Sequence, residues 1–155
     1  MIVRPATWRD LAGMARLEAR CFPVDAWSEG TFWSELAQRP RRSYWVARAD
    51  DSGDGPLLGY AGLSTADEVA EVMTVAVAPE RRGTGLGARL LDVLHRRAVD
   101  AGSSAVMLEV RADNEPARSL YTARGYTVLH TRRGYYRSPQ GEPAVDALVM
   151  RKELV

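Results

Sequence analysis

The chain contains the stretch Val72-Met-Thr-Val-Ala-Val-Ala-Pro-Glu-Arg-Arg-Gly-Thr-Gly-Leu-Gly-Ala-Arg-Leu-Leu91, which passes from apolar residues through glycines to a helical pattern. The valines at its start predict a strand buried on both faces. Pro79 cannot donate a hydrogen bond to a sheet, so this strand should end near Ala78. From Leu86 onward leucines recur at helical spacing. We therefore predict a strand, a glycine-rich turn and a long helix in direct succession.

The turn combines three glycines with two arginines. Gly83, Gly85 and Gly87 carry no side chain that would block a ligand, and Arg81 and Arg82 stand directly before them. A helix begins with free N–H groups and the positive end of its dipole, which is a typical site for a phosphate or pyrophosphate. A glycine-rich turn can also serve only to let a helix pack closely on a sheet, and this alternative stays open.

Composition restricts the class of protein. The 155 residues suit one domain, 1–155, able to bury roughly 70% of its unfolded surface. Lys and Arg total 21 against 20 Asp and Glu, and a net charge of +1 argues against bulk nucleic-acid or membrane binding. A single cysteine, Cys21, excludes an internal disulfide. With no signal-peptide pattern and no apolar run near ~18 residues, we expect a cytoplasmic protein, either a monomer or a weak dimer.

Strand and helix patterns alternate along the rest of the chain. Strands are predicted at 2–6, 43–49, 57–64, 68–78, 105–110, 127–131 and 144–150. Helices are predicted at about 11–20, 28–37, 86–100 and 114–124. Because strand 105–110 follows a strand–helix crossover, it should run parallel to strand 68–78, and the last two strands should form an antiparallel pair. The pattern indicates a mixed sheet flanked by helices.

If the turn holds a phosphate, the reactive end of the ligand should lie near the strand ends beside the turn, and two titratable side chains are candidates there. Glu109 lies in an otherwise apolar strand, where a carboxylate is paired with an arginine such as Arg111, exposed at the strand end, or kept for proton transfer. Tyr121 lies on the next helix, either as a core tyrosine or as a proton donor. The two histidines, His95 and His130, lack spaced carboxylate partners, so no metal site is expected.

Two other phosphate-binding motifs fit poorly. A Walker loop needs Gly-Lys-Ser/Thr at the helix start, where this chain has Gly87-Ala-Arg89. The dinucleotide fingerprint formally matches Gly83-Thr-Gly-Leu-Gly-Ala88, but the residues 79–82 separate it from its strand. Too little chain follows for two nucleotide-binding halves. A nicotinamide-dependent oxidoreductase is therefore a remote alternative.

The segment Arg82-Gly-Thr-Gly-Leu-Gly87 resembles the Gln/Arg-x-x-Gly-x-Gly/Ala signature of the GNAT acetyltransferases, whose backbone N–H groups at this turn bind the pyrophosphate of acetyl-CoA. The order of elements is similar over essentially the whole chain. Within that family, further stretches resemble the ribosomal-protein alanine N-acetyltransferases (RimI type): residues 22–28, 108–114, 117–121, 125–126, 132–136, 146–147 and 150. The resemblance implies an α/β (α+β) fold with a mixed, mostly antiparallel sheet of about six to seven strands, about four helices and a parallel pair at the acetyl-CoA site.

The resemblance also implies roles for single residues. Glu109 takes the position of the general base, and Tyr121 that of the general acid that protonates the departing CoA thiolate. Val77 could donate its N–H to the thioester carbonyl. The implied acetyl-CoA contacts are Val75, Ala76, Val77, Arg82, Gly83, Thr84, Gly85, Leu86, Gly87, Asn114 and Tyr121. Trp27 and either Tyr135 or Tyr136 are expected to narrow the acceptor pocket, with ordinary packing as the alternative.

Proton chemistry favours an α-amine as the acceptor. An α-amine has a pKa of about 7.7–8.0 and a lysine one of about 10.4, so about a quarter of α-amines but roughly one lysine in a thousand are neutral near pH 7.4. A single glutamate is then an adequate base. We expect acetylation of a protein N-terminus, foremost the N-terminal alanine of a small-subunit ribosomal protein. The alternatives are a small-molecule amine acetyltransferase and a non-catalytic acyl-CoA-binding module.

Overall fold

The computed structural model describes residues 1–53, 55–138 and 140–154. Its strands are β1 (Ile2–Pro5), β2 (Arg42–Arg48), β3 (Leu57–Ser64), β4 (Val69–Val77), β5 (Ala105–Arg111), β6 (Thr127–Tyr136) and β7 (Val145–Glu153). Its helices are α1 (Leu11–Cys21), α2 (Glu29–Leu36), α3 (Leu86–Asp100) and α4 (Glu115–Ala123), with short 3-10 turns η1 (Trp8–Asp10) and η2 (Pro79–Arg81). Each predicted helix and strand is confirmed at its place in the chain.

Within the described residues, the strands form one sheet in the order β1-β2-β3-β4-β5-β7-β6. As predicted, β4 and β5 are parallel and the remaining neighbours are antiparallel. The final strand β7 lies between β5 and β6. The prediction that β6 ends at Thr131 is wrong, because the strand continues to Tyr136 and pairs it with Val145. An exposed edge strand needs no apolar alternation, so its polar residues gave no strand pattern.

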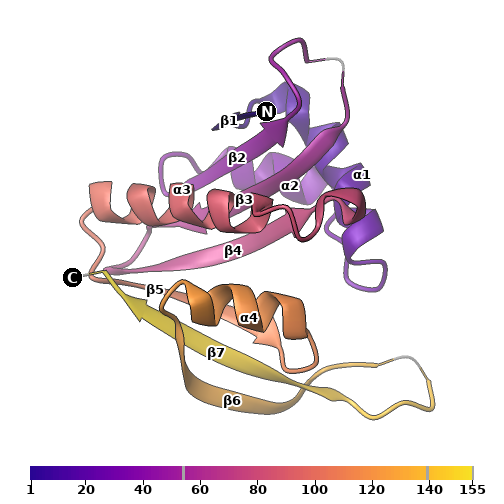
Figure 1. Cartoon of the computed structure of the whole chain (residues 1–155), viewed down its shortest axis with the longest axis vertical. Helices are drawn as coiled ribbons and strands as arrows, with labels where there is room; N and C mark the ends of the chain where they lie inside the picture. Colours follow the sequence, from indigo (N-terminus) through magenta and orange to yellow (C-terminus); the bar gives the residue numbers. More distant parts are fainter. Residues whose placement is uncertain (54, 139, 155) are drawn as a thin grey trace.

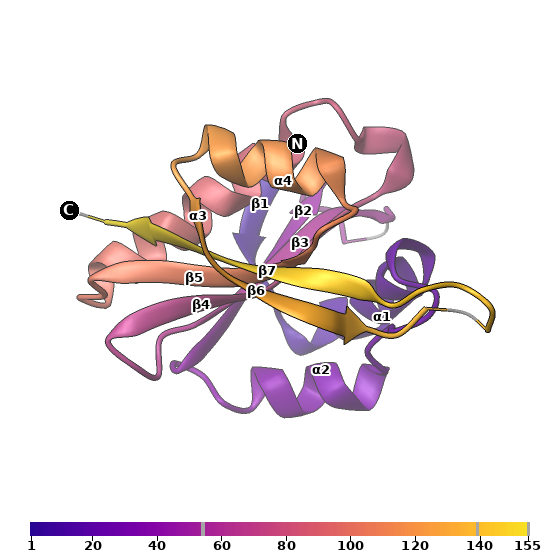
Figure 2. The same cartoon turned by 90° about the horizontal axis from the view of Figure 1, so that it is seen from below.

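The helices cover the two faces of the sheet, α3 and α4 on one and α1 and α2 on the other (Figure 2). Between α3 and the sheet, the leucines of α3 pack with residues of the strands and with Tyr121 of α4. Under α1 and α2, Phe32 makes edge contacts with Tyr44 and Tyr60, at ring-centroid distances of 6.4 and 5.5 Å. None of the helices in the described part of the chain is long and apolar enough to cross a membrane.

The parallel pair is short, and this opens the sheet. Val69–Glu71 of β4 pair with Ala105–Met107 of β5, and no pairing between the two strands follows. Beyond that point β4 stays on β3 as far as Val77, with an irregularity at Met73, and β5 stays on β7 as far as Arg111. Figure 1 shows β4 and β5 drawing apart toward the end of β4 that leads to α3. The facing edges of the two strands are therefore free for a ligand.

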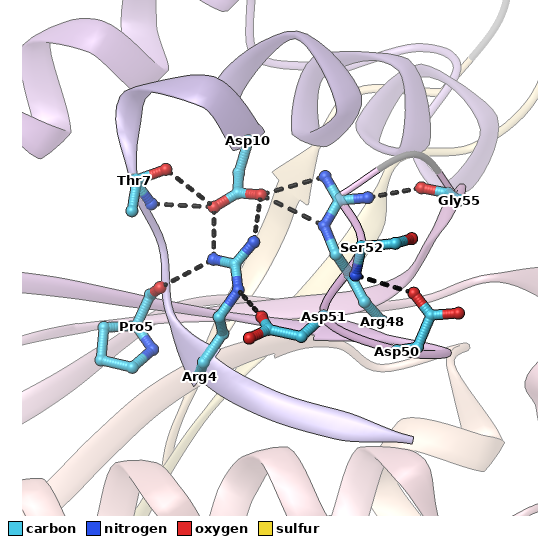
Figure 3. A network of polar contacts seen from close by, with 9 residues as sticks. All are labelled: Arg4, Pro5, Thr7, Asp10, Arg48, Asp50, Asp51, Ser52 and Gly55. Atoms are coloured by element: carbon cyan, nitrogen blue, oxygen red, sulfur yellow. Dashed lines mark hydrogen bonds and ion pairs between the residues drawn. The ribbon is translucent and has the colours of Figure 1, made fainter.

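A buried ionic network fixes the start of α1 to the sheet (Figure 3). The Asp10 carboxylate is 1% exposed and accepts hydrogen bonds from Arg4 at 2.8 and 3.0 Å and from Arg48 at 3.0 and 3.2 Å. The Thr7 N–H donates to the same carboxylate at 2.8 Å, and Arg48 also donates to the Gly55 carbonyl. One carboxylate thus connects β1, β2, the first helix and the loop before β3.

Candidate active site

A groove of about 480 Å³ lies where β4 and β5 part. Its walls are Val72–Val75 of β4, Leu108–Arg111 of β5, the last α1 residue Cys21 and the connector Phe22–Asp25 that follows it. It is completed by residues from α1, the α2 approach, the α4 region and the end of β6: Glu18, Trp27, Asn114, Ala117, Tyr121, Tyr136 and Arg137. Both predicted proton-transfer residues line this one groove.

Glu109 is a partly exposed carboxylate of β5. Its side chain is 28% exposed, and Oε1 lies 3.4 Å from Nη2 of Arg132 on β6. The alternative partner, Arg111, instead pairs with Asp113 at 3.1 Å. The 3.4 Å contact with Arg132 is not among the hydrogen bonds of the described residues, so the carboxylate keeps acceptor capacity toward the groove.

Tyr121 is a buried tyrosine of α4, 8% exposed, and packs against Tyr126 at a centroid distance of 5.8 Å. Its hydroxyl makes no hydrogen bond to any described residue. Burial raises the pKa of Tyr121 to about 12, so the phenol stays neutral and able to donate. Nearby, the Asn114 side chain accepts the Ala117 N–H at 3.2 Å and begins α4, which leaves its amide NH₂ available for another acceptor.

The glycines of the turn have two different functions. Gly83 and Gly85 have φ of 75° and 85°, in the left-handed region that favours glycine. A Cβ at either would have no atom within 4 Å, so the turn is open. Gly87 instead sits against α4, where a Cβ would lie 3.1 Å from Leu120. Close packing therefore explains Gly87, while the first two glycines shape an exposed turn that suits a phosphate-bearing ligand.

The other predicted residues of the turn differ in exposure. Leu86 is 2% exposed, so its side chain belongs to the core and only its backbone can meet a ligand. Thr84 donates its hydroxyl to the Arg81 carbonyl at 2.5 Å, which braces the turn. Arg82 is exposed, and its charge is available to an anion at the start of α3.

The end of β4 connects the groove to the turn. Val75 lines the groove, and a Cβ at Gly87 would lie 3.7 Å from Val77. The Cys21 thiol donates to the Val77 carbonyl at 3.5 Å. Ala76 is 2% exposed in the core beneath α1 and α2, so any ligand contact at this residue would come from its backbone. A ligand extending along β4 would therefore reach both the groove and the turn.

The three predicted aromatic residues fall into two groups. Trp27 and Tyr136 line the groove, whereas Tyr135 is 49% exposed and lies outside its lining. Tyr135 packs edge-on against Tyr136 at 5.2 Å. Arg111 lies over the Tyr136 ring at 5.4 Å, so this ring is held against the β5 wall.

Sequence reasoning missed Glu18, a carboxylate that also lines the groove. It is 3% exposed; its Oε1 accepts the Trp27 N–H at 3.4 Å, and its Oε2 has no partner among the described residues. Burial raises the pKa of Glu18 to about 7, against a smaller opposing effect of that N–H. A signal was present in the sequence, since Glu18 follows Met14 by one helical turn on the buried face of α1.

A parting parallel pair beside an open turn at a helix start fits the class that the sequence resemblance implied, the acyl-CoA-dependent N-acyltransferases. The chain belongs to the acetyltransferase (GNAT) family, whose sequence model matches residues 11–126.

Individual relatives agree with this assignment. A Mycobacterium tuberculosis protein named N-alpha-acetyltransferase RimI is 38% identical over 153 residues, which cover 95% of this chain and 89% of that protein. An uncharacterized Mycobacterium leprae protein is 37% identical over 99% of this chain, but the chain spans only 41% of its length. The crystal structure of the ribosomal-protein-S18-alanine N-acetyltransferase from Escherichia coli matches with a TM-score of 0.84 at 28% identity, over 99% of this chain and 93% of that one.

These similarities confirm the predicted family, its fold and an acetyl-CoA-dependent N-acetyltransferase activity. The roles of single groove residues and the identity of the acceptor stay predictions.

Proposed function

We propose that the protein transfers the acetyl group of acetyl-CoA to the α-amine of a protein N-terminus, foremost the N-terminal alanine of a small-subunit ribosomal protein. The observation that carries the proposal is the groove between β4 and β5, which brings Glu109 and Tyr121 to one opening. The names of the Mycobacterium tuberculosis and Escherichia coli relatives support this class of acceptor.

Glu109 is the base of the proposed reaction. The amine nitrogen attacks the acetyl carbon, and the proton that nitrogen loses goes to the Glu109 carboxylate, directly or through water. The Arg132 guanidinium lies 3.4 Å from the Glu109 carboxylate and helps to position it. Because one partly exposed carboxylate is a modest base, an acceptor whose amine is already partly neutral suits it best.

Tyr121 is the acid of the proposed reaction. When the carbon–sulfur bond breaks, the departing thiolate takes a hydrogen bond and then a proton from the phenol. Burial keeps the Tyr121 phenol protonated throughout the physiological range. Its hydroxyl is unpaired among the described residues, so no competing hydrogen bond must first be broken.

The turn and the end of β4 would hold the cosubstrate. The open positions at Gly83 and Gly85 let backbone N–H groups meet a pyrophosphate, and Arg82 adds charge. The backbone of Val75 to Val77 would run beside the pantetheine arm, which brings the thioester toward the groove.

The test of the two roles uses Glu109→Gln and Tyr121→Phe with an Ala-starting peptide. Each variant should lower kcat by about 10²- to 10⁴-fold, the usual contribution of a positioned acid or base. The Kd for acetyl-CoA, measured by calorimetry, should stay within about twofold, since neither change touches the turn. Wild-type kcat in either variant would remove that residue from the mechanism.

The acceptor class is tested by turnover of Ala-starting peptides against lysine, polyamines and other free amines. The proposal requires kcat/KM to be highest for the peptides, and mass spectrometry should place the acetyl group on the α-nitrogen. A free amine as the best substrate would replace the proposal with small-molecule acetylation.

A further inference from the structure

Glu18 lines the groove with a buried carboxylate, and one of its oxygens has no partner among the described residues. Glu109, which also lines the groove, has Arg132 as its cation, and Asp113 has Arg111. Glu18 forms no ion pair within residues 1–53, 55–138 and 140–154. A buried carboxylate with one unsatisfied oxygen is costly, so its retention beside a ligand groove calls for a donor that the ligand supplies.

Within the described part of the chain no cation pairs with Glu18, and the nearby Arg82 acts instead on the Cys21 thiol. Cys21 faces it from α1, Tyr44 from β2 and the Trp27 N–H from the approach to α2. The Tyr44 hydroxyl already donates to Glu35. Other charged residues of the groove lining are Asp25, Glu109, Arg111 and Arg137.

We infer that Glu18 receives the α-ammonium group of the acceptor N-terminus on its free Oε2 atom and so selects charged N-termini; this inference rests on the proposed N-terminal acetylation. An ammonium has three N–H donors, so one can satisfy Oε2 while another faces the Glu109 side of the same groove. Glu18 keeps its charge and recognises the acceptor. Before attack the bound ammonium releases one proton to water and becomes the neutral amine, and the second proton, lost as the carbon–nitrogen bond forms, goes to Glu109.

The connector at residues 22–25 lies on the proposed entry route of the ammonium group. Phe22 and Val24 are 36% and 70% exposed, and neither belongs to a helix or a strand. Because the Oε2 atom is covered in the structure, the inference requires this segment to move outward as a peptide enters, whereas Glu18 stays on α1. A purely structural Glu18 would only anchor the connector through the Trp27 N–H. The two roles are separable, because a glutamine keeps that acceptor oxygen and loses the charge.

The experiment measures peptide binding to the CoA-saturated protein by calorimetry. The probes are an Ala-starting hexapeptide and the same peptide with propionyl in place of alanyl, which lacks only the amine. Near pH 7.5 the wild type should prefer the alanyl peptide by roughly ten- to hundredfold, the usual effect of a charge-assisted hydrogen bond. Glu18→Gln should reduce the preference to within about threefold, and Glu18→Asp should restore part of it.

The pH dependence is a second readout that an anchoring role would not produce. The affinity for the alanyl peptide should be highest between the pKa of Glu18, about 7, and that of an α-amine, about 8. It should fall on the acid side as Glu18 becomes neutral, and Glu18→Gln should lack this fall. Glu35→Gln is the matched control: Glu35 is also a buried helical glutamate, but it pairs with Arg42 outside the groove.

Each outcome decides the inference. Loss of the preference in Glu18→Gln but not in Glu35→Gln supports it. A Glu18→Gln protein that keeps both the preference and the acid-side fall overturns it, while wild-type peptide acetylation leaves the proposed function standing. If Glu18→Gln does not fold, an affinity of the wild type that is flat from pH 8 to 6 overturns it. If the wild type acetylates no peptide, the proposed function fails and this inference with it.

Discussion

Asp10 offers a measurable test of how the wall of the groove is held in place. Its carboxylate receives hydrogen bonds from two arginines and one backbone N–H, at the point where α1 meets the sheet (Figure 3). The substitution Asp10→Asn keeps the size of the side chain but removes the charge. It also turns an NH₂ group toward guanidinium donors. We expect a large loss of stability that depends on pH.

The magnitude follows from proton linkage. Burial by itself raises the pKa of Asp10, but the hydrogen bonds from Arg4, the Thr7 N–H and Arg48 outweigh it and lower the pKa from 3.8 to about 2. Because the folded pKa is depressed, the ionised carboxylate stabilises the fold above the unfolded pKa, and this is lost as the pH falls toward 2. The contribution is about 2 kcal/mol at pH 7, about 1 kcal/mol at pH 3 and under about 0.5 kcal/mol at pH 2.

The assay is urea unfolding of wild type and Asp10→Asn, followed by circular dichroism at several pH values. The difference in unfolding free energy should be at least about 2 kcal/mol at pH 7 and should shrink by about that amount between pH 5 and 2. The melting temperature near neutral pH should fall by about 4–8 °C. Asp51→Asn is the control, because Asp51 is 76% exposed and reaches Arg4 only at 3.6 Å. It should change stability by less than about 0.5 kcal/mol.

Two results would refute this reasoning. A difference that stays constant from pH 7 to 2 would mean that packing, not charge, carries the contribution of Asp10. A loss no larger than that of Asp51→Asn would mean that the network is energetically neutral, as some buried ion pairs are.

Two further predictions concern the glycine turn and His95. Gly85→Ala forces an alanine into the left-handed conformation, which should lower the free energy of unfolding by about 1–2 kcal/mol and raise the KM for acetyl-CoA. Gly55→Ala, at an open position without a positive φ, should change neither quantity. Chemical unfolding measures the stability, and steady-state kinetics measure the KM. Burial, and to a smaller extent Lys152, lower the pKa of His95 from 6.5 to about 4. The neutral imidazole therefore stabilises the fold fully above pH 6.5, and this stabilisation is lost as the pH falls toward 4. His95→Gln should therefore weaken the dependence of the melting temperature on pH between pH 6.5 and 4. The same pH dependence in the variant and the wild type would contradict this prediction.

The local elements were predictable because each has a strong pattern of its own. The leucines of α3 recur at helical spacing and are buried, as expected for an amphipathic helix on a sheet. Gly85 directly precedes α3 with φ of 85°, so the glycine pattern did mark the turn. Of the alternatives for Glu109, pairing with an arginine is observed, although the partner is Arg132 and not Arg111.

The rest depends on contacts between distant parts of the chain. Arg132 reaches Glu109 only because β7 brings β6 near β5, and no spacing in the sequence gives that order of strands. Glu18 lies between arginines at 16 and 20, a composition typical of an exposed helix. Its burial becomes visible only from its one-turn spacing to Met14, which places it on the apolar face of α1.

The opening of the groove is itself a consequence of strand pairing. β3 pairs with β4 as far as Val77, and β7 pairs with β5 over Ala105–Arg111, so each parted strand keeps a paired neighbour on its other side. The free edges can therefore face a ligand without collapsing onto each other. Because β7 pairs with β5 along Ala105–Arg111, the β5 wall that carries Glu109 is complete only when residues 145–153 have paired. Weakening β7 should thus loosen the base of the proposed reaction before it disturbs the turn, which rests on β4 and α3.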